Sequence, residues 1–163
     1  PTTKFCHLHQ LKAQEGNNGA PLITISTRCD EDGRNKRVQV IHTGDTRTSG
    51  KGVIIDNLPL ADFEDEWIQV ETEMHYTHHG TFRIKLTRIS DGKVLADQSF
   101  ADIDLWRKGA TSIRNKFGIY RSLGRKMQSA SDRPDNGLKD ESLQLADFKV
   151  YEAHTNPNPQ PHD

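Results

Sequence analysis

The segment from Ile113 to Arg121 carries side chains that could hold and transform an anionic sugar. As a β-strand it would alternate between two faces, so that Arg114, Lys116 and Tyr120 share one of them. Gly118 would leave a gap on that face, where a ligand can approach the backbone closely. Two cations and a phenol around this gap suit a sugar acid. An ordinary half-buried strand with solvated basic residues would show the same pattern.

A second polar strip is predicted near the amino end, where two short strands flank a polar turn. The inferred hairpin register places His7 and His9 on one face, together with two hydroxyls and a guanidinium, those of Thr24, Ser26 and Arg28. The histidines could be zinc ligands, a general base with a substrate-orienting group, or solvent-facing residues. Zinc needs a third ligand, and no residue at a suitable spacing specifies one.

A carboxylate pair offers a different chemistry. Glu71 and Glu73 share the face of a predicted strand, at a separation short enough for a retaining glycoside hydrolase. Alternating glutamates are also common on exposed strands, so a solvated strand face is the alternative.

The elements that must position these residues are strands. Asp91-Gly92 between two alternating runs is a strong hairpin signal, and no segment has a convincing helical period. Regularly spaced strands with turn residues between them predict one all-β domain over residues 1–153, an antiparallel β-sandwich or jelly roll. A Pro-rich extended tail is expected over residues 154–163. The predicted strands are 5–12, 22–28, 37–42, 52–56, 67–76, 81–89, 94–100, 113–121 and 142–151.

The two cysteines bear on the first hairpin. A turn centred between Asn17 and Asn18 pairs residues whose numbers sum to 35, which would place Cys6 opposite Cys29. Opposed residues of an antiparallel pair lie within disulfide reach, and a disulfide would indicate a secreted protein. Two unrelated buried thiols are the alternative.

Composition limits the classes of partner. The 163 residues include 22 Lys and Arg against 23 Asp and Glu, a net charge of -1, so no global field favours nucleic acid or membrane. No apolar run approaches the ~20 residues of a membrane span, and no signal peptide is visible. Any preference for anions must come from a local patch.

Two of these strands carry a resemblance. His7-Leu8-His9 and Lys116-Phe117-Gly118-Ile119-Tyr120 resemble the signature strands of the jelly-roll polysaccharide lyases, a group with a concanavalin A-like fold that includes alginate lyases and glucuronan and heparin lyase-like proteins. Alginate lyases carry Gln-X-His on one strand and Lys-X-Gly-X-Tyr on a later one. The chain matches the second motif fully, and the first with His7 in place of glutamine. Residues 5–12, 106–122 and 145–148 extend the similarity over most of the chain.

The resemblance implies β-elimination on a uronate-containing polysaccharide, with no cofactor required. The C5 proton becomes acidic only when the neighbouring carboxylate is neutralised, and a base must then remove it. On this chain the resemblance assigns proton transfer to Tyr120 and the partner base to His9. The groups that would neutralise the carboxylate and position the sugar are His7, Arg114 and Lys116, with Arg28 as a further candidate.

Some expectations stay open at this stage. The same fold hosts non-catalytic carbohydrate-binding modules and lectins, which are the alternative function. Domains of the lyase group are longer, with an arginine-bearing strand upstream of the first motif. The chain begins almost at that motif, so the missing strands could belong to a companion chain, could have been removed, or could be absent from a reduced domain. Calcium is a candidate structural ion with oxygen ligands near Asp62, Asp65, Asp140 and Asp147, although solvated carboxylates fit equally.

Overall fold

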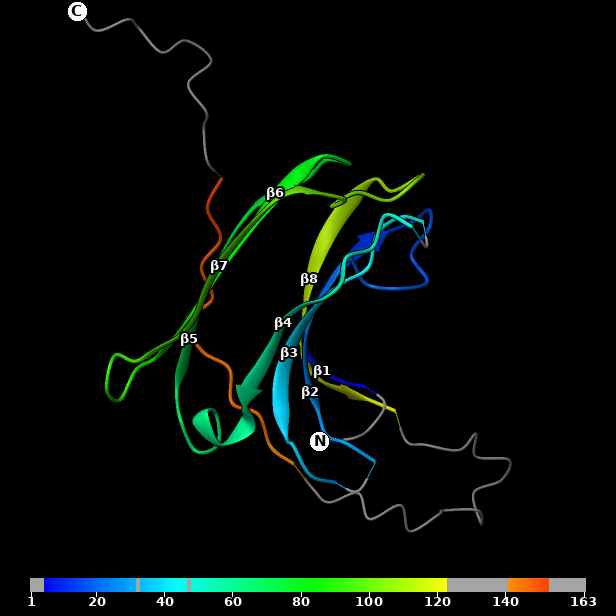
Figure 1. Ribbon diagram of the computed structural model, residues 1–163. Coiled ribbons are helices and arrows are strands. Elements are labelled where there is room, and N and C mark those ends of the chain that lie inside the picture. Colours follow the sequence, from blue (N-terminus) through cyan, green and yellow to red (C-terminus); the bar gives the residue numbers. More distant parts are fainter. Residues whose placement is uncertain (1–4, 32, 47, 123–140, 153–163) are drawn as a thin grey trace, which may run out of the picture.

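The computed structural model describes residues 5–31, 33–46, 48–122 and 141–152. Within these residues the chain is all-β, and its strands form two antiparallel sheets (Figure 1). None of the described residues belongs to a helix long and apolar enough to span a lipid bilayer. The predicted tail over residues 154–163 lies outside the described residues.

The strands are paired mainly with their neighbours in sequence. The five-stranded sheet has the order β4-β3-β2-β1-β8 and the three-stranded sheet the order β5-β6-β7, so β8 returns to pair with β1. A short 3₁₀ turn, η1 (Leu60–Asp62), connects the two sheets between β4 and β5. The strands are β1 (Cys6–Gln14), β2 (Ile23–Arg28), β3 (Arg37–His42), β4 (Gly52–Pro59), β5 (Ile68–His75), β6 (Gly80–Arg88), β7 (Val94–Ile103) and β8 (Ser112–Arg121).

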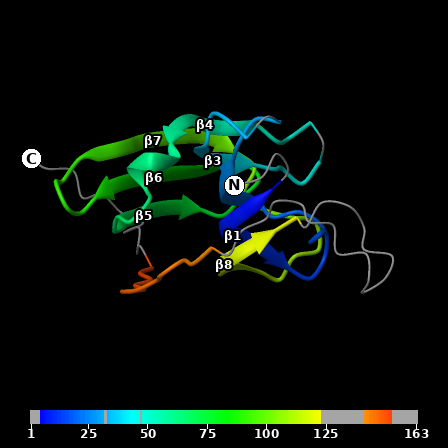
Figure 2. The same ribbon diagram turned by 90° about the horizontal axis from the view of Figure 1, so that it is seen from below.

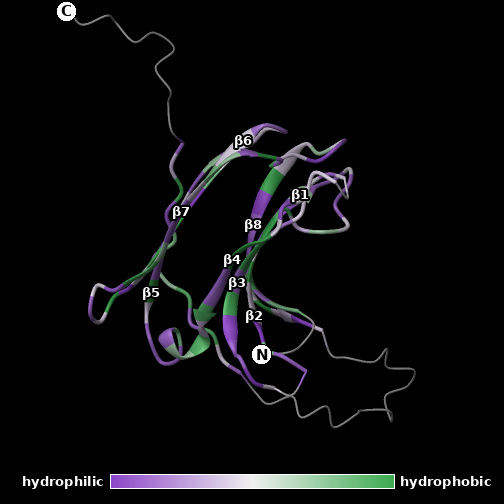
Figure 3. Ribbon diagram, viewed as in Figure 1, coloured by the Kyte–Doolittle hydropathy of each residue, from purple (hydrophilic) through white to green (hydrophobic). Residues whose placement is uncertain are grey.

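The hydrophobic core lies between the two sheets. Val38 and Val40 of β3 are fully buried, as are the alternate residues Phe82, Ile84 and Leu86 of β6, because each strand directs alternate side chains inward. Figure 3 shows hydrophilic and hydrophobic residues along the same strands, as this alternation requires. The buried apolar cluster is made of Leu11, Leu22, Ile23, Ile25, Val38, Val40, Ile55, Leu58, Phe82, Ile84, Leu86, Ala96, Ile103 and Leu105.

An irregularity in β1 changes which side chains face the core. Against β2, the register moves from His7 opposite Ser26 to His9 opposite Ile25, so Leu8 is an extra residue. An extra residue of this kind is a β-bulge, and it interrupts the simple alternation of faces. His7 and His9 therefore lie on opposite faces of the sheet, and the sequence-based prediction that they share one is wrong.

The same register corrects the expected disulfide. Cys6 lies opposite Thr27 rather than Cys29, two residues away from the predicted partner. Both cysteines are described, and they are not joined by a disulfide. The last predicted strand is also absent, since residues 141–152 form neither helix nor strand.

One buried arginine holds the loops together at one end of the sandwich. Arg107 is 2% exposed, and its guanidinium donates hydrogen bonds to backbone carbonyls of two separate loops. Nη2 reaches the carbonyls of Thr43 at 2.8 Å and Pro21 at 3.1 Å, and Nη1 donates to Gly44. Because buried carbonyls need donors, this one side chain fixes the loop that follows β3 against the loop between β1 and β2.

We expect Arg107→Met to lower the free energy of unfolding by about 3 kcal/mol or more, because it leaves several buried carbonyls without a donor. Urea denaturation followed by circular dichroism measures this loss. Lys108→Met is the matched control: the neighbouring side chain is exposed, and its loss should change stability by less than about 0.5 kcal/mol. Equal stability of the two variants would contradict this role of Arg107.

Candidate functional site

Polar side chains gather on the face of the five-stranded sheet that points away from the second sheet. We call this surface the polar face. The sheet curves so that the polar face is its concave side (Figure 1). Residues paired across a ladder share a face, so the register identifies its members on β1, β2, β3 and β8. They are His7, Gln10, Lys12, Thr24, Ser26, Arg28, Arg37, Gln39, Arg114, Lys116 and Tyr120.

The β1–β8 ladder brings an imidazole and a phenol together at one corner of the polar face. His7 lies directly opposite Tyr120, with ring centroids 6.1 Å apart. The ring of Phe5 stacks on His7 at 4.8 Å and contacts Tyr120 at 5.3 Å. His7 Nδ1 is 2.6 Å from Ser26 Oγ, and this hydrogen bond restricts the rotation of the imidazole ring. Tyr120 is 61% exposed, so its hydroxyl is open to a ligand.

The surroundings of His7 favour a neutral imidazole. Burial, reinforced by the positive charge of Arg28, lowers the pKa of His7 to about 4. At neutral pH the ring therefore carries one proton and keeps one nitrogen able to accept another. An uncharged imidazole beside a phenol is a suitable pair for general acid–base chemistry.

Cations lie on the same face farther along β1 and β8. Lys12 lies opposite Arg114 and Gln10 opposite Lys116, and no side-chain hydrogen bond or ion pair joins Arg114 or Lys116 to another described residue. None of the ladder positions on this face of β8, β1 and β2 is an aspartate or glutamate. A hollow of about 130 Å³ beside Tyr120 is lined by Gln10 and by residues 116–120. This half of the polar face therefore carries positive charge with no carboxylate at its ladder positions.

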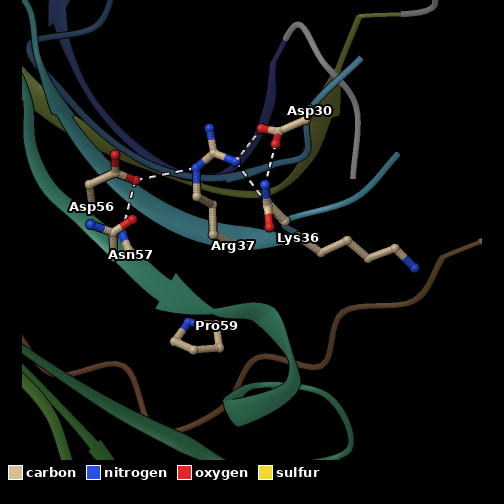
Figure 4. A pocket seen from close by; sticks show the side chains of 7 residues that line it. Asp30, Lys36, Arg37, Asp56, Asn57 and Pro59 are labelled. Atoms are coloured by element: carbon tan, nitrogen blue, oxygen red, sulfur yellow. Dashed lines mark hydrogen bonds and ion pairs between the residues drawn. The ribbon is translucent and has the colours of Figure 1, made fainter. Parts of the chain in front are cut away.

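The other end of the polar face is neutralised internally. Arg37 lies between two carboxylates, with nitrogen–oxygen distances of 3.0 Å to Asp30 and 3.3 Å to Asp56 (Figure 4). Gln39 donates a hydrogen bond to the same Asp56 oxygen at 2.9 Å. These groups border a pocket of about 550 Å³ lined by Asp30, Asn35, Lys36, Arg37, Asp56, Asn57 and Pro59. Sequence reasoning did not identify this pocket, because its residues come from one loop and two strands.

His9 is not part of the polar face. It is 9% exposed on the inner face, where its Nε2 lies 2.9 Å from Asn115 Oδ1 and its ring stacks on Phe117 at 4.7 Å. Burial lowers its pKa, and the hydrogen bond that the His9 Nε2–H donates to Asn115 Oδ1 opposes this effect in part. The predicted pairing of His9 with Tyr120 as base and acid is therefore wrong. The bulge at Leu8 brings His7 to Tyr120 instead.

The remaining predicted site residues lie where the alternation of β8 and β2 puts them. Arg114, Lys116 and Tyr120 share the polar face, and Arg28 joins it from β2, opposite Arg37. Burial and the adjacent Arg37 charge lower the pKa of Arg28. The sequence did not assign Gln10 to this face, and only the bulge reveals it.

The alternative carboxylate pair lies elsewhere. Glu71 and Glu73 share a face of β5, as predicted, but it is the outer face of the three-stranded sheet. Glu73 is paired with Arg83 at 3.1 Å, and neither glutamate lines one of the two pockets described above. An ion-paired carboxylate on an open sheet face is a poor general acid.

The proposed calcium ligands do not gather into a site. The Asp62 carboxylate forms ion pairs with Arg88 at 2.9 Å and with Lys93 at 3.2 Å. Asp140 lies outside the described residues. Within the described part of the chain, no group of three or more His, Cys, Asp or Glu side chains could hold a metal ion. A calcium site at these residues stays a prediction, and no step of the proposed mechanism involves calcium.

Three further histidines have structural partners. The buried His42 accepts a hydrogen bond from the Lys51 backbone at its Nδ1 and lies 2.8 Å from the Asp104 carbonyl through Nε2. His78 Nδ1 is 2.8 Å from the Asp104 carboxylate, and His79 contacts Asp102. These contacts hold the end of the sandwich opposite the His7–Tyr120 corner together, and none reaches the polar face.

Comparison with known proteins found no matching family model, curated protein or solved structure. The function must therefore be argued from the residues and their geometry.

The lowered pKa of His7 makes stability depend on pH. The unfolded chain binds a proton at His7 below its ordinary pKa of 6.5, whereas the folded protein does so only near pH 4. Stability from this group is therefore complete above pH 6.5 and is lost as the pH falls toward 4. We expect urea denaturation at several pH values to show a smaller loss over this interval in His7→Gln than in the wild type. An unchanged slope would show that His7 titrates normally in the folded state.

Proposed function

We propose that the polar face binds a uronate-containing polysaccharide and that the protein cleaves it by β-elimination. The observation that carries this proposal is the His7–Tyr120 pair, an uncharged imidazole and an exposed phenol on facing ladder positions. Unpaired cations lie on the same face beside it. We also assign the sandwich to the jelly-roll group, on the strength of its two antiparallel sheets and the motif resemblance.

Lys116 and Arg114 carry the positive charge that can neutralise the carboxylate of the uronate, which is the first requirement of the reaction. The proton on C5 of a uronate is weakly acidic because its removal puts further negative charge next to a carboxylate. A cation or strong donor on that carboxylate stabilises the developing charge. Lys116 borders the hollow beside Tyr120, so we assign it to the carboxylate, with Arg114 as the second cation along β8.

His7 and Tyr120 provide the proton transfers. In the proposed step His7 takes the proton from C5, the electron pair forms the C4–C5 double bond, and the bond from C4 to the glycosidic oxygen breaks. The hydroxyl of Tyr120 gives its proton to the leaving oxygen. Proton exchange with His7 then restores both groups, and the reaction consumes no water. Ser26, hydrogen-bonded to His7, orients the ring for this transfer.

The proposal is tested by incubating the protein with glucuronan, alginate or a heparin-like polymer and following the ultraviolet absorbance of unsaturated uronate. We expect Tyr120→Phe to reduce turnover at least 100-fold while changing the affinity for the polymer less than about threefold, since it removes the acid but not the cations. Tyr151→Phe is the control, because this exposed tyrosine lies outside the polar face.

Two histidine variants check the corrected assignment. His7→Gln should abolish turnover, whereas His9→Gln should retain it per folded molecule, because His9 lies on the inner face. Binding without any unsaturated product in the wild type would favour the non-catalytic carbohydrate-binding function and reject the lyase. Saturated products would instead indicate a hydrolase.

Charge at Lys116 should control affinity. We expect Lys116→Gln to weaken binding of the polymer about tenfold at low salt and to reduce the dependence of affinity on salt, because a fully exposed cation binds through screened electrostatics. Lys85→Gln, on the outer face of the other sheet, is the control and should leave binding unchanged. Isothermal titration calorimetry at several salt concentrations measures both. Equal effects of the two substitutions would place the binding surface elsewhere.

A further inference from the structure

The two sheets of the sandwich differ in width. Five strands face three among the described residues, so the inner face of the wider sheet extends beyond the narrower one. β8 lies at this uncovered side, next to β1, and its inward residues are incompletely covered. Phe117 is 49% exposed and Ile119 is 37% exposed, although both alternate with the polar-face residues and so face inward.

The edge of the narrower sheet on this side also has an inward-facing apolar residue that is incompletely buried. Val70 of β5 pairs with the buried Leu86, so its side chain faces the core. It is nevertheless 48% exposed, because β5 is an edge strand of its sheet among the described residues and no further strand pairs with it. Apolar side chains of both sheets are thus open to solvent along one side of the sandwich. Large apolar side chains exposed along one side of a domain are typical of an interaction site.

Residues 141–152 border the same opening. Figure 2 places this segment beyond β5, on the side away from β6, while β8 lies on the same side of the molecule in the other sheet. The Phe148 ring contacts Phe117, with centroids 4.6 Å apart. The segment has half-exposed leucines at 143 and 145 and belongs to no ladder. It is an apolar border of the opening that pairs with neither sheet.

We propose that a β-strand from a partner polypeptide adds to the open edge of β5, between β5 and residues 141–152. The free edge of β5 provides backbone donors and acceptors for such a strand, as in other cases of β-strand addition. Alternate side chains of the partner must be apolar, because they would cover Val70, Phe117 and Ile119. This widens the narrower sheet toward the width of the one it faces.

Charge specifies the other side chains of the partner. Those side chains would lie on the outer face of β5, beside Glu71, which forms no ion pair with another described residue, and Glu73, which is ion-paired with Arg83. Opposite charges on neighbouring strands stabilise a sheet, and like charges oppose its formation, so basic residues fit these positions. A second copy of β5 fits poorly, since antiparallel pairing of two β5 strands centred on residue 72 would place Glu71 opposite Glu73. The favoured occupant is a different strand that alternates apolar and basic residues.

A designed peptide tests the proposal. The probe is a nine-residue fluorescent peptide that alternates valine and lysine, and its control alternates valine and glutamate. With the full chain, fluorescence anisotropy should show binding of the lysine peptide at least tenfold tighter than that of the glutamate peptide. Hydrogen exchange should show new protection of β5 (Ile68–His75) on binding, and not of β7.

Matched variants locate the site. Val70→Arg should weaken binding of the lysine peptide at least tenfold, because it places a charge in the apolar opening. Val94→Arg should change it less than twofold, since this valine is similarly exposed, at 50%, on the other edge strand of the same sheet. Glu71→Lys should make the glutamate peptide bind more tightly than the lysine peptide. The substituted side chain lies on the outer face, so it does not alter the apolar opening. Circular dichroism checks that each variant is folded.

Three outcomes would overturn the proposal: equal binding of both peptides, equal binding by the two arginine variants, or protection of β7 rather than β5. A concentration-dependent dimer without peptide, abolished by Val70→Arg, would also overturn it and would identify a second copy as the occupant.

Discussion

The antiparallel pairing of β1 with β8 is the interaction on which the site depends. It joins residues near position 10 to residues near position 116, and so brings two short motifs from opposite ends of the described chain onto one surface. The extra residue at Leu8 then decides which histidine faces the polar face. Without the extra residue, His7 and His9 would share one face of β1, because side chains two positions apart point to the same side of a strand.

The two faces of the five-stranded sheet perform different tasks. The inner face stabilises the fold through packed aliphatic side chains, and His9 is accommodated there by a hydrogen bond and an aromatic contact. The outer face carries charge, arranged unequally along its width. Cations near β8 have no described carboxylate partner, whereas Arg37 near β4 is held by two. An anionic ligand would gain most from contacts at the β8 end, where its charge replaces no existing ion pair.

The loop end of the sandwich and its open apolar side also differ in how completely their groups are paired or buried. Arg107 and the contacts of His42 hold the loops at one end of the sandwich with buried hydrogen bonds, and only the buried Nε of Arg107 has no partner among the described residues. The side bordered by β5, β8 and residues 141–152 is different, because inward apolar residues there lack cover among the described residues. The polar face and the open apolar side are separate surfaces of the same sheet pair, and we propose an anionic ligand for the first and a β-strand for the second.

The sequence by itself determined the all-β class, most strand positions and the face shared by Arg114, Lys116 and Tyr120, because alternation of side chains is a local property of a strand. It did not determine the register of the first hairpin. The Cys6–Cys29 pairing, the shared face of His7 and His9, and the strand over residues 142–151 were therefore predicted wrongly. Register depends on hydrogen bonds between distant strands and on a single extra residue that no local pattern announces. Only the tertiary structure could place His7, rather than His9, beside Tyr120.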